Sequence, residues 1–172
     1  NITISIDLNY RSKLWNYGKL PTEIIPELVS YCDVVMGNIW AVEKMLGINP
    51  NLPINIDDNH LLQAAELSIQ TLMASYPKIK KVAYTFRFDE HYWAVFYQNN
   101  QLYKSNVHAI SQLVDKVGSG DCFMAGLIYG SINAFKAQEI IDFAAQAAVG
   151  KLYEKGDATQ QKLDQILNNL TH

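Results

Sequence analysis

The residues best suited to chemistry lie in the segment Asp115-Lys-Val-Gly-Ser-Gly-Asp-Cys-Phe-Met-Ala-Gly126, where two glycines flank Ser119 and Asp121 follows. Gly118 and Gly120 can adopt backbone angles that other residues avoid. A glycine turn that opens a helix leaves several N–H groups unpaired, and with the helix dipole they attract anions. Asp121 would add a proton acceptor beside such a phosphate-binding turn. An ordinary helix N-cap explains the same residues, and this short motif alone does not separate the two interpretations.

A second group of polar residues follows the first predicted strand. Residues 2–8 alternate between apolar and polar side chains, which predicts a strand there. Asp7, Asn9 and Arg11 fall at or just past the carboxyl end of this strand, the edge of an open α/β sheet where ligands bind. A structural ion pair between Asp7 and Arg11, with Asn9 in a turn, is the alternative.

Strands and helices alternate along the chain, which predicts an α/β fold. The predicted strands cover residues 2–8, 33–36, 81–86, 91–97 and 102–104, the last two as a hairpin across Gln98-Asn-Asn-Gln101. The predicted helices cover 22–31, 39–46, 58–75, the stretch after Asp121, 137–155 and 159–170, with Thr22 and Asp58 as N-caps. We therefore expect a three-layer arrangement, a mostly parallel sheet flanked by helices, with the hairpin as an antiparallel portion.

Length and composition describe an ordinary globular protein. The 172 residues suit a single domain, with 49% hydrophobic residues and a net charge of −3. No basic excess favours nucleic acid, and no apolar run is long enough for a membrane span. Cys32 and Cys122 lack metal-ligand spacing, so we expect buried thiols in a reducing cytoplasm. Because the chain opens with Asn1 directly in a strand, we expect a fragment, a processed chain or a sequence lacking an N-terminal part.

The longer segment around Asp121 resembles the C-terminal signature of the ribokinase-like (phosphofructokinase-B) carbohydrate kinases, D-x-x-G-A-G-D-x-F-x-A-G, with Ser119 in place of the usual alanine. The segment Asp7-Leu-Asn-Tyr-Arg11 looks like the D-x-N-x-R segment of the 2-keto-3-deoxygluconate kinase branch. Both matches lie in family order and at family spacing. The resemblance covers nearly the whole chain but only the C-terminal half of a complete member, so the N-terminal half and the lid would be absent.

This resemblance implies transfer of the γ-phosphoryl group of ATP, with Mg²⁺, to a hydroxyl of a sugar acid, most closely 2-keto-3-deoxygluconate. Asp121 would accept the hydroxyl proton, and the N–H groups of Gly118, Ser119 and Gly120 would stabilise the transferred group. Gly118 and Gly120 would also contact ATP. No residue is predicted as a metal ligand.

The resemblance also implies which residues contact the sugar, which partners the protein has and where it is located. Arg11 and Asn9, together with Asp121, would bind the sugar acid, since a guanidinium suits a carboxylate or a phosphate. The implied partners are the sugar acid and ATP, without nucleic acid or membrane, in the cytoplasm. A homo-oligomer formed through the lid is also compatible with the resemblance.

Further nucleotide contacts are implied at three other places. Thr85 and Arg87 end the predicted strand before the nucleotide-contacting turn, where a plain strand-end turn is the alternative. Asn38 matches the first residue of a family N-x-x-E motif near the magnesium and phosphate groups, but Ala41 stands where the glutamate would be. An N-cap role explains Asn38 equally well. Gly150 lies on the helix that borders the adenine in the family, where small residues also serve helix packing.

Three alternatives remain open at this point. Another sugar such as fructose or ribose would keep the same chemistry. A catalytically silent binding or oligomerisation module would keep the fold, which Ala41 favours and the intact Asp121 opposes. A nicotinamide-dependent dehydrogenase would need glycines directly after the first strand, where the segment Asp7–Arg11 stands instead.

Overall fold

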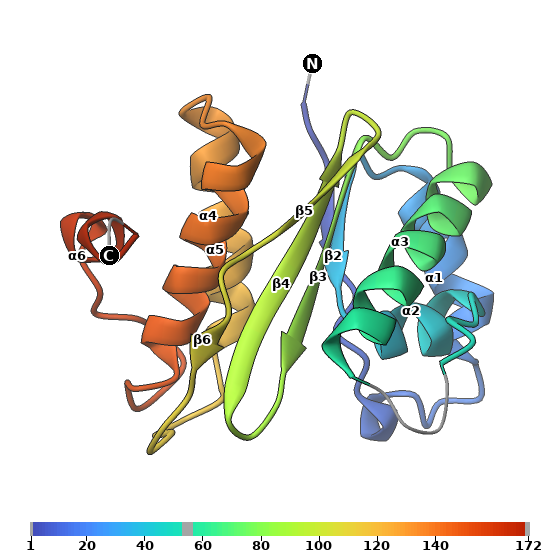
Figure 1. Ribbon diagram of the computed structural model, residues 1–172. Helices are drawn as coiled ribbons and strands as arrows, with labels where there is room; N and C mark the ends of the chain where they lie inside the picture. Colours follow the sequence, from blue (N-terminus) through green and yellow to red (C-terminus); the bar gives the residue numbers. More distant parts are fainter. Residues whose placement is uncertain (1, 53–56, 171–172) are drawn as a thin grey trace. The chain divides into compact units, whose positions relative to one another are not determined.

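The computed structural model describes residues 2–52 and 57–170, and their strands form one mixed sheet (Figure 1). Its strand order is β1 (Ser5–Asp7), β2 (Val34–Gly37), β3 (Lys81–Arg87), β4 (His91–Gln98) and β5 (Gln101–Lys104), with β6 (His108–Ala109) paired to β4. The first three strands pair in parallel, whereas β4 and β6 are antiparallel. With the helices that accompany these strands, the predicted α/β class is confirmed.

The described residues group into two compact units. The first comprises Asn1–Tyr84 and Tyr97–Leu102, and the second comprises Thr85–Phe96 and Tyr103–His172. The boundary therefore runs through strands β3, β4 and β5.

In the first unit, β2 lies between β1 and β3. Its Val35 is opposite Ile6 on one side and Val82 on the other. Helices α1 (Pro21–Ser30), α2 (Ile39–Leu46) and α3 (Asp58–Ser75) accompany these strands, and a short helix, η1 (Ser12–Leu14), follows β1 (Figure 1). The buried core between them is apolar and includes Val29, Val35, Ile39, Val42, Ala65, Ile69 and Leu72.

The first strand is shorter than the sequence predicts. Residues 2–8 alternate as expected, but β1 covers only Ser5–Asp7. The N–H group of Ile4 donates to the carboxylate of Asp33 at 3.1 Å rather than to a neighbouring strand, and Ile2 is 89% exposed. A side chain thus takes the place of the backbone partner at the start of the strand. The N–H group of Ile4, and after it the ammonium of Lys80 at 3.3 Å, hold the pKa of Asp33 below its ordinary value.

Two predicted N-caps in this unit are wrong by one or two residues. Helix α1 begins at Pro21, so Thr22 lies inside its first turn, because proline suits the first helical position. Helix α3 is capped by Asp57, whose carboxylate accepts a hydrogen bond from the N–H group of His60 at 2.8 Å, and Asp58 is the first helical residue. Both helices nevertheless occur where the sequence places them.

The predicted hairpin between β4 and β5 is confirmed. Its two-residue turn, Asn99 and Asn100, has φ values of 53° and 59°, as this type of hairpin turn requires. Strand β6 was not predicted, since its two residues are too few to show a periodicity.

In the second unit, helices α4 (Ser119–Ile132) and α5 (Ala137–Lys151) pack side by side, as Figure 1 shows. An ideal Cβ on Gly126 would lie 2.6 Å from the Cα of Ala144, so the two backbones approach closely there. None of the described helices is both long and apolar enough to span a lipid bilayer.

The last two predicted helices are too long. Helix α5 ends at Lys151 rather than at residue 155, and α6 covers only Leu163–Asn168 rather than 159–170. Between them the carboxylate of Glu154 accepts hydrogen bonds from Thr159 and from the N–H group of Gln160, which holds a non-helical turn. The turn contains Gly156 at φ 92°.

Candidate functional site

The predicted catalytic segment begins with a left-handed glycine. Gly118 has φ 82° and ψ −9° and is the N-cap of α4. An ideal Cβ at this position would lie 2.0 Å from the backbone carbonyl oxygen of Asp157. Both the backbone conformation and the close approach of a second chain segment therefore require glycine here.

The first turn of α4 presents backbone N–H groups that have no partner within the helix. The first backbone hydrogen bond of the helix is donated by Cys122 to the carbonyl of Gly118 at 2.9 Å. The N–H groups of Ser119, Gly120 and Asp121 precede this bond and therefore have no acceptor within the helix. Ser119 is buried, Gly120 is half-buried and Asp121 is exposed. The turn thus combines a helix N-terminus, which favours an anion, with an accessible carboxylate.

A guanidinium lies beside this turn. Nη1 of Arg87, at the end of β3, donates to Oγ of Ser119 at 3.2 Å, and this hydroxyl donates to the carbonyl of Lys116 at 3.0 Å. The sequence predicts Arg87 and Ser119 as separate candidates, and the structure brings them together. Burial raises the pKa of Tyr92, and the charge of Arg87 opposes that shift.

Asp115 connects two turns of the second unit, a role that the sequence interpretation missed. Its carboxylate accepts a hydrogen bond from the N–H group of Val117 at 3.0 Å and another from that of Gly156 at 3.1 Å. These N–H groups hold the pKa of Asp115 below its ordinary value, that of Val117 contributing most. The sequence contains one signal for this role, since Asp115 is the first aspartate of the motif. Its partner Gly156 lies 41 residues away, so the contact itself could not be predicted.

Gly150 and Thr85 occupy less distinctive positions. An ideal Cβ on Gly150 would lie 1.8 Å from Oε1 of Gln161, and Nε2 of this glutamine donates to the carbonyl of Ala147 at 2.9 Å. Gly150 thus leaves room for Gln161 within the second unit. Thr85 lies half-buried on β3, two residues before Arg87. Nucleotide contacts by Gly150 and Thr85 stay predictions.

In the first unit, Asn9 and Arg11 are exposed directly after β1. The N–H group of Asn9 donates to the carbonyl of Asp7 at 3.0 Å, which forms a tight turn. Arg11 is the N-cap of η1, and no ion pair links it to any residue that the structure describes. The alternative of an Asp7–Arg11 ion pair is therefore not found.

The N-cap interpretation of Asn38 is confirmed. Its Oδ1 accepts a hydrogen bond from the N–H group of Ala41 at 2.8 Å at the start of α2. Ala41 is buried, and Glu43 lies 3.9 Å from the ammonium of Lys44. Across the described parts of the chain, no cluster of three or more His, Cys, Asp or Glu side chains could hold a metal ion. A magnesium ion bound chiefly through phosphates and water is compatible with this donor set.

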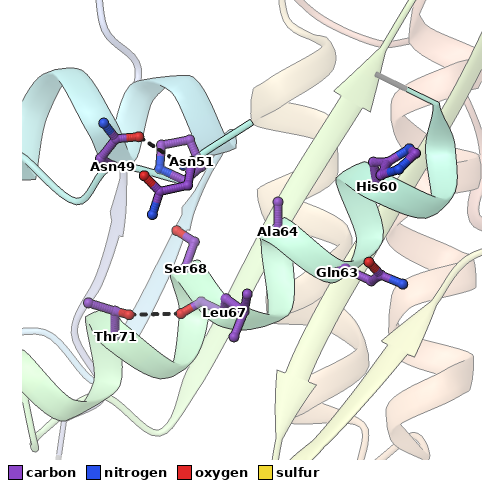
Figure 2. A pocket seen from close by; sticks show the side chains of 9 residues that line it. Asn49, Asn51, His60, Gln63, Ala64, Leu67, Ser68 and Thr71 are labelled. Carbon is purple, nitrogen blue, oxygen red and sulfur yellow. Dashed lines mark hydrogen bonds between the residues drawn. The ribbon is translucent and has the colours of Figure 1, made fainter. Parts of the chain in front are cut away.

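A pocket of about 260 Å³ lies in the first unit, between residues 49–51 and α3. Figure 2 shows Asn51 and Ser68 opposite one another across it. Its lining residues are Asn49, Pro50, Asn51, His60, Gln63, Ala64, Leu67, Ser68 and Thr71. None of the predicted site residues lines this pocket, so it is separate from the predicted sugar and nucleotide contacts.

Sugar kinases are among the solved structures that this chain resembles. The 2-dehydro-3-deoxygluconokinase of Thermotoga maritima has a TM-score of 0.86 and 30% identity, over 99% of this chain and 51% of that one. A putative 2-keto-3-deoxygluconate kinase of Enterococcus faecalis has a TM-score of 0.78 and 22% identity, over 99% and 50%. A putative ribokinase II of E. coli, in complex with ATP and Mg²⁺, has a TM-score of 0.71 and 18% identity, over 98% and 48%. The chain thus spans about half the length of these relatives.

A family model provides the assignment. No curated protein matches the chain. The model described as pfkB family carbohydrate kinase matches residues 1–163, which include both segments that carry the resemblance found in the sequence. The chain therefore belongs to the pfkB family of carbohydrate kinases.

Proposed function

We propose that this chain forms the C-terminal part of an ATP-dependent sugar kinase that phosphorylates a hydroxyl of 2-keto-3-deoxygluconate. The observation that carries the proposal is the start of α4, where Gly118 in the left-handed conformation precedes the first-turn N–H groups of the helix and the exposed Asp121. This arrangement supplies an anion site and a base within one helical turn. Because the chain spans about half the length of its relatives, the complete sugar pocket includes residues outside it.

In the proposed reaction, Asp121 accepts the proton of the sugar hydroxyl while that oxygen attacks the γ-phosphorus of ATP. The N–H groups of Ser119 and Gly120 stabilise negative charge on the transferred group. Arg87, already next to Ser119, adds a positive charge on the same side of the turn. Magnesium, bound with the nucleotide, would neutralise the phosphate oxygens.

Two observations favour a sugar acid over a neutral sugar. Arg11 is exposed beyond β1 and has no ion-pair partner in the described ranges, so its guanidinium is available for a carboxylate. The Thermotoga maritima relative, at 30% identity, is a 2-dehydro-3-deoxygluconokinase. The buried Ala41 in place of the motif glutamate supports the second candidate, a catalytically silent member of the fold.

A substrate panel tests the proposal. The natural protein at full length is incubated with Mg²⁺-ATP and 2-keto-3-deoxygluconate, fructose or ribose, and phosphorylated product is followed by ³¹P NMR. We expect the highest kcat/KM for 2-keto-3-deoxygluconate. A higher value for fructose or ribose would keep the reaction but reject the substrate. No product with any sugar, from folded protein, would reject the kinase and favour the silent module.

A further inference from the structure

Lys151, the last residue of α5, has an unusual environment. Among the described residues it is the only charged side chain with no exposed surface. Its Nζ donates one hydrogen bond, to the carbonyl of Glu154 at 2.9 Å. An ammonium group withdrawn from water is costly unless it is paired, so its burial needs an explanation beyond packing.

The stem of Lys151 lies directly against the turn that opens α4. An ideal Cβ on Gly118 would be 3.2 Å from Cε of Lys151 and 2.0 Å from the carbonyl oxygen of Asp157. The lysine stem and this carbonyl therefore form the surface on which Gly118 rests. The same lysine is hydrogen-bonded to the chain segment that begins at Glu154, so it touches both turns.

Asp115 joins the same two turns from the outside. Its carboxylate accepts hydrogen bonds from Val117, next to Gly118, and from Gly156, next to Asp157. After these two N–H groups, the positive charge of Lys151 also helps to hold the pKa of Asp115 low. The Asp115 carboxylate thus clamps residues 117 and 156 together, next to the residues that Lys151 contacts.

We infer that Lys151 is a positioning residue for the phosphoryl transfer proposed above: its stem and ammonium hold the Val117–Gly118 turn against residues 154–157 and so fix the direction of the N–H groups that open α4. The inference rests on the proposed function. Stability alone does not explain such a residue, because replacing a buried charge by a hydrophobic side chain of similar size is often neutral or stabilising. Donors aimed at developing charge, in contrast, must be fixed in place before the reaction.

The first test replaces Lys151 by methionine, which keeps the length of the stem and removes the charge. In the natural protein at full length, kcat for the preferred sugar should fall by about 10–100-fold, since misplacement by about 1 Å costs up to roughly 10²-fold. The KM for the sugar should stay within about twofold, and the melting temperature should be unchanged or higher. Lys155→Met, at an exposed position nearby, is the matched control and should leave all three unchanged.

A double mutant tests whether Lys151 acts through the clamp. Asp115→Asn removes the carboxylate charge and one of its two acceptors. If both residues fix the same turn, Lys151→Met combined with Asp115→Asn should lower kcat no more than the more severe single change. Independent, multiplicative losses would contradict the inference.

Amide hydrogen exchange provides a readout that does not depend on activity. In Lys151→Met the amides of Val117 and Gly156 should exchange at least about tenfold faster, while that of Leu127, farther along α4, should not change. Unchanged exchange at Val117 and Gly156, or wild-type kcat in Lys151→Met, would overturn the inference. A wild-type protein that phosphorylates no sugar would reject the proposed function, and the exchange rates would still decide whether Lys151 holds the turn.

A second variant covers the case in which Lys151→Met does not fold. Lys151→Gln keeps a hydrogen-bond donor near Glu154 without the charge, and the same pattern of kcat and exchange is expected from it. If neither variant folds while Lys155→Met does, Lys151 is a structural residue and the inference is wrong.

Discussion

The left-handed Gly118 and its contact with Asp157 predict a large cost for Gly118→Ala. An alanine at φ 82° costs about 1–2 kcal/mol from backbone conformation alone. Its Cβ would meet the carbonyl oxygen of Asp157 at 2.0 Å, and a backbone atom cannot rotate away as a side chain can. Overpacking of this kind typically costs about 1–3 kcal/mol. We therefore expect Gly118→Ala to lower the free energy of unfolding by about 2–5 kcal/mol.

Urea denaturation, followed by circular dichroism, measures this loss. Gly47→Ala is the matched control, because Gly47 also has a positive φ, 71°, but an added Cβ there would meet nothing within 4 Å. Gly47→Ala should lower the free energy of unfolding only by the cost of the left-handed backbone conformation, about 1–2 kcal/mol. Equal losses in the two variants would mean that no segment presses against Gly118.

Three further predictions concern helix packing, pH and the sugar. Gly126→Ala should lower the free energy of unfolding by about 1–3 kcal/mol in urea, because its Cβ would lie 2.6 Å from the backbone of Ala144; Gly130→Ala, which would meet a side-chain atom at 3.0 Å, should cost less. Folding lowers the pKa of Asp115 below its ordinary value of 3.8, so the stabilisation by its carboxylate is present above pH 3.8 and is lost as the pH falls through the lower folded value. The stability difference between wild type and Asp115→Asn should therefore shrink at acid pH, and a difference that grows there would contradict this. Arg11→Met should raise the KM for the sugar acid at least about tenfold and leave that for ATP unchanged in steady-state kinetics, whereas equal changes in both would argue against a sugar contact.

The elements that the sequence predicts well have strong local signals. Helix α2 matches its predicted bounds because Asn38 and Gly47 act as caps, one through its side chain and the other through a left-handed backbone. The hairpin of β4 and β5 follows from Asn99-Asn100. In each case the residues that set the boundary are neighbours in the sequence.

The elements that differ depend on particular side-chain hydrogen bonds, both distant and local. The strand predicted over 2–8 is shorter because Ile4 donates to Asp33 instead of to a strand. Helix α5 stops at Lys151, and Glu154 holds the non-helical turn that follows through its bonds to Thr159 and Gln160. No periodicity in the sequence reports such side-chain contacts.

The candidate site likewise has a part that the sequence predicts and contacts that it does not. The spacing of Gly118, Gly120 and Asp121 predicts a turn that opens a helix, and the structure has α4 beginning there. The hydrogen bond between Asp115 and Gly156 joins residues 41 apart, and the burial of Lys151 depends on the fold around it. The position of the turn was therefore readable from the sequence, whereas the contacts that support it were not.

The central claim is that the carboxylate at the start of α4 takes part in ATP-dependent sugar phosphorylation, and Asp121→Asn tests it most directly. The natural protein at full length and this variant are compared with 2-keto-3-deoxygluconate and Mg²⁺-ATP, with ATP binding measured by calorimetry. We expect kcat to fall by about 10²–10⁴-fold in Asp121→Asn while ATP affinity is retained. Asp164→Asn, at an exposed position in the first turn of α6, should change neither. Near-normal turnover in Asp121→Asn would exclude Asp121 as the base in phosphoryl transfer.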